Sequence, residues 1–135
     1  MTRQEMFTKV WLGLEAQGWK RSLRTSPASE AEGSCAYRGM NGAKCAAGHL
    51  IPDENYKPEM EGLRIMHLVR HNPLIFGEPL DTFEEHLAYK MQRAHDFFKV
   101  EVEDGSMKNF EDMKSAFEEI ARIYKFTIPE REQAQ

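Results

Sequence analysis

Apolar residues near the start of the chain recur at intervals of three and four positions. They are Met6, Phe7, Val10, Trp11 and Leu14. This period places them on one face of a helix, with polar residues between them. Thr2 and Glu5 have the spacing of a capping box, and Gly18 is a natural helix end. The pattern predicts an amphipathic helix over residues 3–17.

Three further segments carry the helical period. The first spans residues 60–71, and its apolar positions are Met60, Leu63, Met66 and Val69. The second opens with Asp81 and Glu84 in capping-box spacing. Its apolar positions are Phe83, Leu87, Met91, Ala94 and Phe98. The third begins near Asn109 and ends before Pro129, and its apolar positions are Phe110, Met113, Phe117, Ile120 and Tyr124. These segments predict three more helices.

One dipeptide predicts a β-hairpin. Asn41 and Gly42 tolerate the positive φ of a tight turn, which favours a hairpin over residues 34–48. A two-residue turn would pair Cys35 with Gly48, whereas a turn one residue longer would set Cys35 opposite His49. The register would therefore decide which side chains meet.

Two points of secondary structure stay open in the sequence. The second arm of this hairpin, "KCAAGHLI", is rich in alanine and has no β-branched residue before Ile51, so a short helix is an alternative there. Residues 98–103, "FKVEVE", alternate between apolar and polar before the turn signal Asp104-Gly105. This segment is either a short strand or a fraying helix end.

These elements predict a mostly helical α+β fold, with about four helices and one β-hairpin at 34–48. The 135 residues, 41% of them hydrophobic, suffice for one domain with its own core. We expect a single domain over 1–135. Residues 20–33 mix Ser, Pro, Gly and charges without a period, which predicts a mobile loop, and residues 130–135 form a polar tail.

The charge and the apolar pattern exclude some partners. The chain has 18 Lys and Arg against 22 Asp and Glu, a net charge of −4, so non-specific attraction to nucleic acid is not expected. No apolar run approaches the length of a membrane helix, and the first residues lack the pattern of a signal peptide. We expect a cytoplasmic protein that does not bind membranes.

Cys45 is a candidate nucleophile. In a short helix starting near residue 45, its thiolate would be stabilised by free backbone N–H groups. Catalysis would also need a base, and His49, His86 and His95 are the candidates. A cysteine among small residues is more often a buried apolar side chain that packs closely. A cysteine-dependent hydrolase that uses Cys45 with His95 is therefore an alternative function, and an incomplete catalytic set favours a protein that binds.

Zinc is a second alternative for the same stretch. Cys45 and His49 stand four residues apart, and Cys35 could supply a third ligand, but the paired Cys-x2-Cys spacing of structural zinc sites is absent. No cofactor is expected from this pattern alone.

Aromatic and basic residues near the predicted turn suit a binding surface. They are Tyr37, Arg38, Lys44 and Tyr56. Rings and cations together favour a protein interface or an anionic ligand of nucleotide type. We expect these four residues to bind a host protein or a small anionic ligand.

The stretch "CAYRGMNGAKCAAGHLIPDENYKPEMEG" resembles a group of small uncharacterised proteins of bacteria and tailed phages. These proteins share Cys-x-Tyr-Arg, followed by a turn that contains Gly. After the turn come a Lys or Arg, the segment Cys-Ala-x-Gly-x-Leu-Ile-Pro-Asp-Glu-x-Tyr, and then Met-Glu-Gly. The matching residues are Cys35, Tyr37, Arg38, Lys44, Cys45, Ala46, Gly48, Leu50, Ile51, Pro52, Asp53, Glu54, Tyr56, Met60, Glu61 and Gly62. The group often has cysteine at the position of His49, and "QRAHD" at 92–96 is a second point of similarity.

The resemblance implies origin in a phage or another mobile element, and it brings no catalytic residues with it. An acidic protein of this class without an enzyme signature is expected to act stoichiometrically. It would inhibit a host protein, such as a defence protein, or sequester a small anionic ligand.

Overall fold

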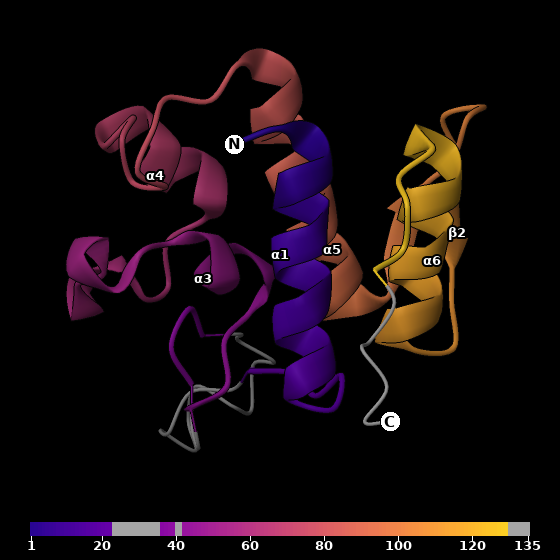
Figure 1. Ribbon diagram of the computed structural model, residues 1–135, viewed down its shortest axis with the longest axis horizontal. Coiled ribbons are helices and arrows are strands. Elements are labelled where there is room, and N and C mark those ends of the chain that lie inside the picture. The colour runs from indigo at the N-terminus through magenta and orange to yellow at the C-terminus, as the bar shows by residue number, and fades with distance from the viewer. Residues whose placement is uncertain (23–35, 40–41, 130–135) are drawn as a thin grey trace.

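The computed structural model describes residues 1–22, 36–39 and 42–129 (Figure 1). Its longer helices are α1 (Arg3–Ala16), α4 (Ile65–His71), α5 (Thr82–Phe97) and α6 (Met113–Tyr124). The shorter elements are α3 (Ala46–Leu50), the 3-10 turns η2 (Asp53–Asn55) and η3 (Pro58–Met60), and the strands β1 (Lys99–Glu101) and β2 (Met107–Asn109). The mostly helical α+β class is confirmed.

Helix α1 lies in the middle of the molecule, with α3 and α4 on one side and α6 with strands β1 and β2 on the other (Figure 1). Helix α5 contacts α3, α4, α6 and β1, so it joins the two sides. Helix α1 contacts α6 through aromatic rings, since the centroid of the Phe7 ring lies 6.4 Å from that of Phe117. The Phe7 centroid also lies 5.1 Å from that of Phe126, which follows α6. No helix in the described ranges has the length and apolar character needed to cross a membrane.

The predicted helix starts at residues 2 and 81 are confirmed. The Thr2 hydroxyl accepts from the backbone N–H of Glu5, and the Glu5 carboxylate accepts from the backbone N–H of Thr2. Asp81 and Glu84 form the same capping box at the start of α5. Each box satisfies N–H groups that a helix start would otherwise leave without partners.

The core is one cluster of buried apolar side chains to which every helix of seven or more residues contributes. The whole α1 stripe is buried, as its period predicts. The stripe predicted for 60–71 is only partly correct, because Leu63 precedes α4 and is 40% exposed. The apolar side chain of Leu63 therefore lies on the surface.

The strands lie in the C-terminal half of the chain. Strands β1 and β2 are antiparallel and pair Lys99 with Asn109 and Glu101 with Met107, so the strand alternative for residues 98–103 is confirmed. Asn109 therefore ends a strand instead of opening a helix, and α6 begins only after its N-cap residue Asp112.

The hairpin expected at 34–48 has a different form in the residues that the structure describes there. The backbone N–H of Gly39 donates to the carbonyl of Ala43 (2.8 Å), and that of Cys45 donates to the carbonyl of Ala36 (3.2 Å). These bonds match neither of the two expected registers, and no strand forms among the described residues 36–39 and 42–48. The second arm is the alternative short helix, α3. Cys35, Asn41, most of the 20–33 loop and the 130–135 tail lie outside the described residues.

Candidate functional site

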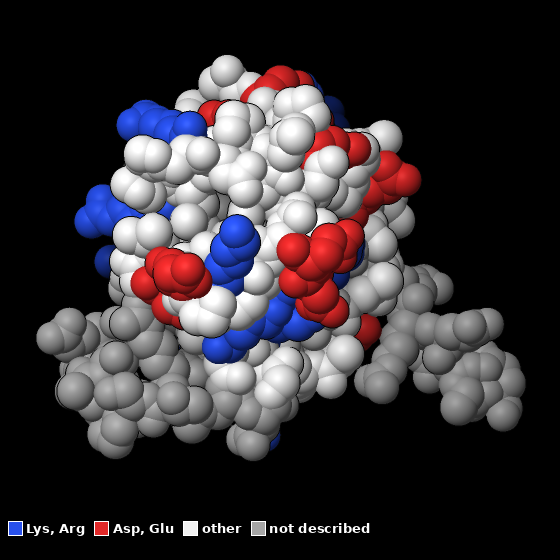
Figure 2. Space-filling view, turned by 90° about the vertical axis from the view of Figure 1, so that its left-hand side faces the viewer, with Lys and Arg blue, Asp and Glu red and all other residues white. Residues whose placement is uncertain are grey.

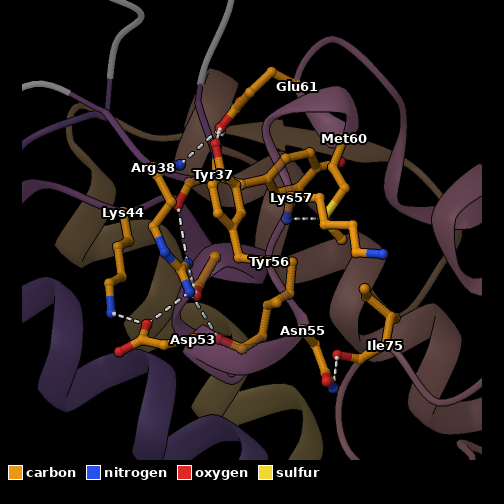
Figure 3. Close-up of polar contacts among 12 residues, drawn as sticks. Tyr37, Arg38, Lys44, Asp53, Asn55, Tyr56, Lys57, Met60, Glu61 and Ile75 are labelled. Carbon is orange, nitrogen blue, oxygen red and sulfur yellow. Dashed lines mark hydrogen bonds and ion pairs between the residues drawn. The ribbon is translucent and has the colours of Figure 1, made fainter.

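Arg38 precedes α3 in the chain, and its side chain contacts the C-terminal end of that helix and the residues that follow it (Figure 3). Its guanidinium donates to the carbonyls of Gly48 (2.8 Å) and Ile51 (3.0 Å) and to the Asp53 carboxylate (2.9 Å). It also lies over the Tyr56 ring, 4.8 Å from the centroid. Carbonyls at the end of a helix lack partners within the helix, so Arg38 supplies donors that α3 itself cannot.

Glu61 organises the same corner from the other side. Its carboxylate accepts from the backbone N–H groups of Tyr37 (3.0 Å) and Arg38 (3.1 Å) and from the Tyr56 hydroxyl (2.7 Å). Burial of the phenol, together with the hydrogen bond to Glu61, raises the pKa of Tyr56 to about 12. The Tyr37 hydroxyl donates to the carbonyl of Leu63. We call Tyr37, Arg38, Tyr56 and Glu61 the Glu61 cluster.

Lys44, the remaining residue of the predicted binding surface, lies beside the Glu61 cluster. Its ammonium group is 3.7 Å from the Asp53 carboxylate. Its backbone N–H donates to the side chain of Gln17 (3.1 Å), and its carbonyl accepts from the same side chain (2.8 Å). The structure thus brings Tyr37, Arg38, Lys44 and Tyr56 into one region, where their polar groups contact other parts of the chain.

Figure 2 shows the face of the molecule that carries α4, with Lys and Arg interspersed among Asp and Glu. No large surface of a single charge is visible there. An anion approaching this face would meet both signs of charge, so long-range attraction to it is weak.

Cys45 is a buried N-cap residue. Its sulfur accepts from the backbone N–H of Gly48 (3.3 Å), and none of its surface is exposed. Gly48 is required at this position, because a Cβ there would overlap the carbonyl of Tyr37. A substrate could reach the sulfur only after local opening of the fold.

His49 lies between α3 and α1 as a neutral ring. Its Nε2 is 3.0 Å from the side-chain oxygen of Gln17. Burial lowers the pKa of His49 to about 4, and the charge of Lys44 adds to this effect. The ring packs directly on Gly13 of α1, so His49 serves helix packing.

His95 is fully buried on α5 within a polar network. Its Nδ1 is 2.8 Å from the Asp96 carboxylate, which also accepts from Gln92 (3.0 Å). The oxygen of Gln92 accepts from the backbone N–H of Ala47 (2.9 Å), which links α5 to α3. The Nε2 of His95 has no hydrogen-bond partner in the described structure.

The catalytic and zinc alternatives gain little from this geometry. Cys45 and His95 expose none of their surface, so neither faces a site that a substrate could enter. Within the described ranges, no three His, Cys, Asp or Glu side chains are grouped as metal ligands would be. Cys35, the third ligand of the zinc hypothesis, lies outside those ranges.

A cleft of about 410 Å³ opens between residues 62–65 and α5; we call it the α5 cleft. Among the side chains that line it are Tyr37, Arg64, Tyr89, Gln92, Arg93, Asp96 and Phe97. Its volume lies in the range of small-molecule sites. Phe97 is 60% exposed and Tyr89 is 39% exposed, so both rings offer apolar surface to a ligand.

Arg93 is one of the two arginines that line the α5 cleft. One of its terminal nitrogens donates to the Tyr89 hydroxyl (2.7 Å), and its Nε is buried without a partner in the described structure. Arg93 forms no ion pair with a described carboxylate, and Arg64 across the cleft forms none either. A half-buried guanidinium that pairs with no described carboxylate is a candidate group for binding an anion, because burial makes an uncompensated charge costly.

A smaller cleft of about 190 Å³ lies between α5 and the two strands; we call it the hairpin cleft. Tyr89 and Arg93 line both clefts. The hairpin cleft adds His86, Lys90, Lys99, Val100, Glu101 and Met107. The two hollows therefore meet along one helix.

The sequence contains a signal for this site that the binding hypothesis did not use. Tyr89, Arg93 and Phe97 stand four residues apart, which puts them on one side of α5. They fall outside the stripe of buried residues, so the two rings had to lie on the polar side of an amphipathic helix. Large rings on such a side are typical of binding surfaces.

Comparisons with known proteins give no relative: no family model matches the chain, and neither a curated protein nor a solved structure matches it. A function for this protein therefore rests on the chemistry of its own residues.

Proposed function

We propose that the protein binds a small anionic ligand in the α5 cleft and acts stoichiometrically, without transforming it. The observation that carries this proposal is Arg93, a half-buried guanidinium that no described carboxylate neutralises. An anionic group beside Arg93 would supply the missing counter-charge and accept charge-assisted hydrogen bonds, which are stronger than those between neutral groups.

The rings of the cleft indicate the rest of the ligand. Tyr89 and Phe97 expose apolar surface beside Arg93, and Arg64 faces the same hollow. Aromatic faces bind planar groups by stacking. A ligand with one planar ring and one anionic group, of the nucleotide type, fits this combination best.

Sequestration is the mode of action that we favour. The buried Cys45 and His95 expose no surface to a ligand, and the residues around Arg93 include no nucleophile paired with a base. Sequestering a small anion also agrees with the accessory role that the resemblance of residues 35–62 to small phage proteins implies.

A second candidate is inhibition of a host protein through the same surface. Leu63, Tyr89 and Phe97 are exposed apolar residues near an arginine. Aromatic and arginine side chains dominate many protein interfaces. A partner on this surface would also depend on Arg93, but the free protein would then show no affinity for a small anion.

Calorimetric titration with adenosine monophosphate tests the proposal. We expect one molecule to bind per chain, and we expect Arg93→Gln to weaken binding about 10- to 100-fold, the value of one charge-assisted hydrogen bond. The control is Arg70→Gln, because Arg70 is exposed on α4 and lines neither cleft.

The control variant should bind like the wild type, and both variants should keep the wild-type melting temperature within a few degrees. The proposal fails if the wild type binds neither this nucleotide nor inorganic phosphate. It also fails if both variants bind the nucleotide as tightly as the wild type does.

A further inference from the structure

Tyr89 and Arg93 form the boundary between the α5 cleft and the hairpin cleft, since both side chains line both hollows. The Tyr89 hydroxyl accepts from Arg93, so the two side chains are held together. A group bound at Arg93 thus lies at the junction of two adjoining sites. A ligand larger than one nucleotide could occupy both.

The hairpin cleft, like the α5 cleft, combines basic side chains with apolar surface. Lys99 forms no ion pair with a described carboxylate, whereas Lys90 pairs with Glu101 (3.9 Å) and donates to the Tyr124 hydroxyl (2.7 Å). Met107 adds apolar surface, since it is 43% exposed, and Tyr89 lends its ring to this cleft as well. This second hollow can take a planar apolar group and a negative charge, as the first can.

Four cationic side chains and two carboxylates line the two clefts together. The cations are Arg64, Lys90, Arg93 and Lys99, and the carboxylates are Asp96 and Glu101. Asp96 already accepts hydrogen bonds from His95 and Gln92. The clefts are therefore locally basic in a chain whose net charge is −4.

We infer that the ligand is a dinucleotide, with one base in each cleft and the linking phosphate at Arg93. This inference rests on the proposed function and names its ligand class. Cations that follow a phosphate backbone, with aromatic side chains stacked on the bases, are the usual means of binding short single strands, and the Tyr89 ring lines both clefts. An acidic peptide would use the cations but leave the Tyr89 and Phe97 rings without planar partners.

The inference is compatible with the acidic net charge. A negative chain has no general attraction for long nucleic acids. A ligand with one or two phosphates needs only local cations and a fitted hollow, so the charge of the whole protein matters less.

Two probes distinguish a one-cleft ligand from a two-cleft ligand. They are adenosine monophosphate and 5′-phosphorylated adenylyl-adenosine, each titrated calorimetrically into the wild type, Lys99→Gln and Lys114→Gln. Lys99 lines only the hairpin cleft. Lys114 is exposed on α6 and lines neither cleft, so its variant is the matched control.

We expect the dinucleotide to bind at least tenfold more tightly than the mononucleotide, with one molecule per chain. Lys99→Gln should weaken dinucleotide binding at least threefold and leave mononucleotide binding unchanged, whereas Lys114→Gln should change neither. Equal affinities for the two probes, or a Lys99→Gln variant that binds the dinucleotide like the wild type, would overturn the inference.

The outcomes separate this inference from the proposed function. Equal affinities with intact binding of the mononucleotide would refute the dinucleotide and leave the α5 cleft as an anion site. A wild type that binds neither probe would refute both. If tetraglutamate displaced the dinucleotide and bound more tightly than it, the ligand would be an acidic peptide and the inference would be wrong.

Discussion

Replacing Gly13 with alanine tests how α1 and α3 pack together. Gly13 lies inside α1, where it has no Cβ to contact the His49 ring. A Cβ at this position would lie 2.6 Å from Cε1 and 2.7 Å from Cγ of His49, and closer still to Nδ1. The ring cannot move away freely, because its Nε2 is held by Gln17 and the ring is partly buried.

Two opposing effects decide the magnitude. Alanine is favoured over glycine inside a helix by about 1 kcal/mol. Overpacking a well-filled contact costs about 1–3 kcal/mol. Since Cβ would overlap three ring atoms, we expect the cost to lie near the upper value, so Gly13→Ala should lower the free energy of unfolding by about 1–2 kcal/mol.

A double-mutant cycle with His49→Ala isolates the contact. Without the imidazole, Gly13→Ala should keep only its helical benefit and stabilise the protein by about 1 kcal/mol. Urea unfolding, followed by the fluorescence of Trp11 and Trp19, measures all four proteins. Trp11 is buried and its ring packs edge-on against that of Trp19, 4.7 Å between centroids. A Gly13→Ala variant more stable than the wild type would refute the contact with His49.

Two further predictions concern titratable groups. Because the pKa of His49 is about 4 when folded and 6.5 in the reference state, the unfolded chain binds the extra proton first. The neutral His49 ring therefore contributes about 1–3 kcal/mol to the free energy of unfolding, which is fully present above pH 6.5 and is lost as the pH falls towards 4. His49→Gln should remove this part of the pH dependence in urea unfolding. An unchanged pH profile would contradict the prediction. Glu61→Gln should lower the melting temperature by several degrees and bring the high pKa of Tyr56 down in an ultraviolet titration, because the carboxylate accepts three hydrogen bonds. Glu59→Gln, at an exposed neighbour, is its control, and equal effects of the two variants would disprove the role of Glu61.

The parts of the fold that the sequence predicts well are local. Each capping box joins residues three positions apart, so Thr2 with Glu5 and Asp81 with Glu84 could be recognised without any tertiary contact. The α1 stripe is equally local, because the helical period alone places its members on one face.

The errors arise where distant segments compete. The Asn41-Gly42 signal favoured two strands, but Cys45 caps α3 and Arg38 supplies donors to the carbonyls of Gly48 and Ile51, which stabilises a helical second arm. The same contacts engage the guanidinium of Arg38, for which the sequence predicts an external ligand. A sequence does not reveal that a cation will be occupied by backbone carbonyls of its own chain.

The α5 cleft depends on contacts between distant parts of the chain. It exists because residues 62–65 approach α5, held in part by the Tyr37 hydroxyl on the carbonyl of Leu63. Tyr37 is the one residue of the predicted binding surface that also lines this cleft. The sequence alone could place Tyr89, Arg93 and Phe97 together on the polar face of α5. It could not show that residues 62–65 lie opposite them.

The most direct test of the central claim is a map of backbone amide NMR shifts during titration with adenosine monophosphate. The α5 cleft predicts that the largest shifts fall on residues 62–65 and 89–97, and that Arg93→Gln removes them. Shifts confined to residues 37–39 and 44–56, with Arg93→Gln behaving like the wild type, would place the ligand at Arg38, Lys44 and Tyr56 and contradict the account.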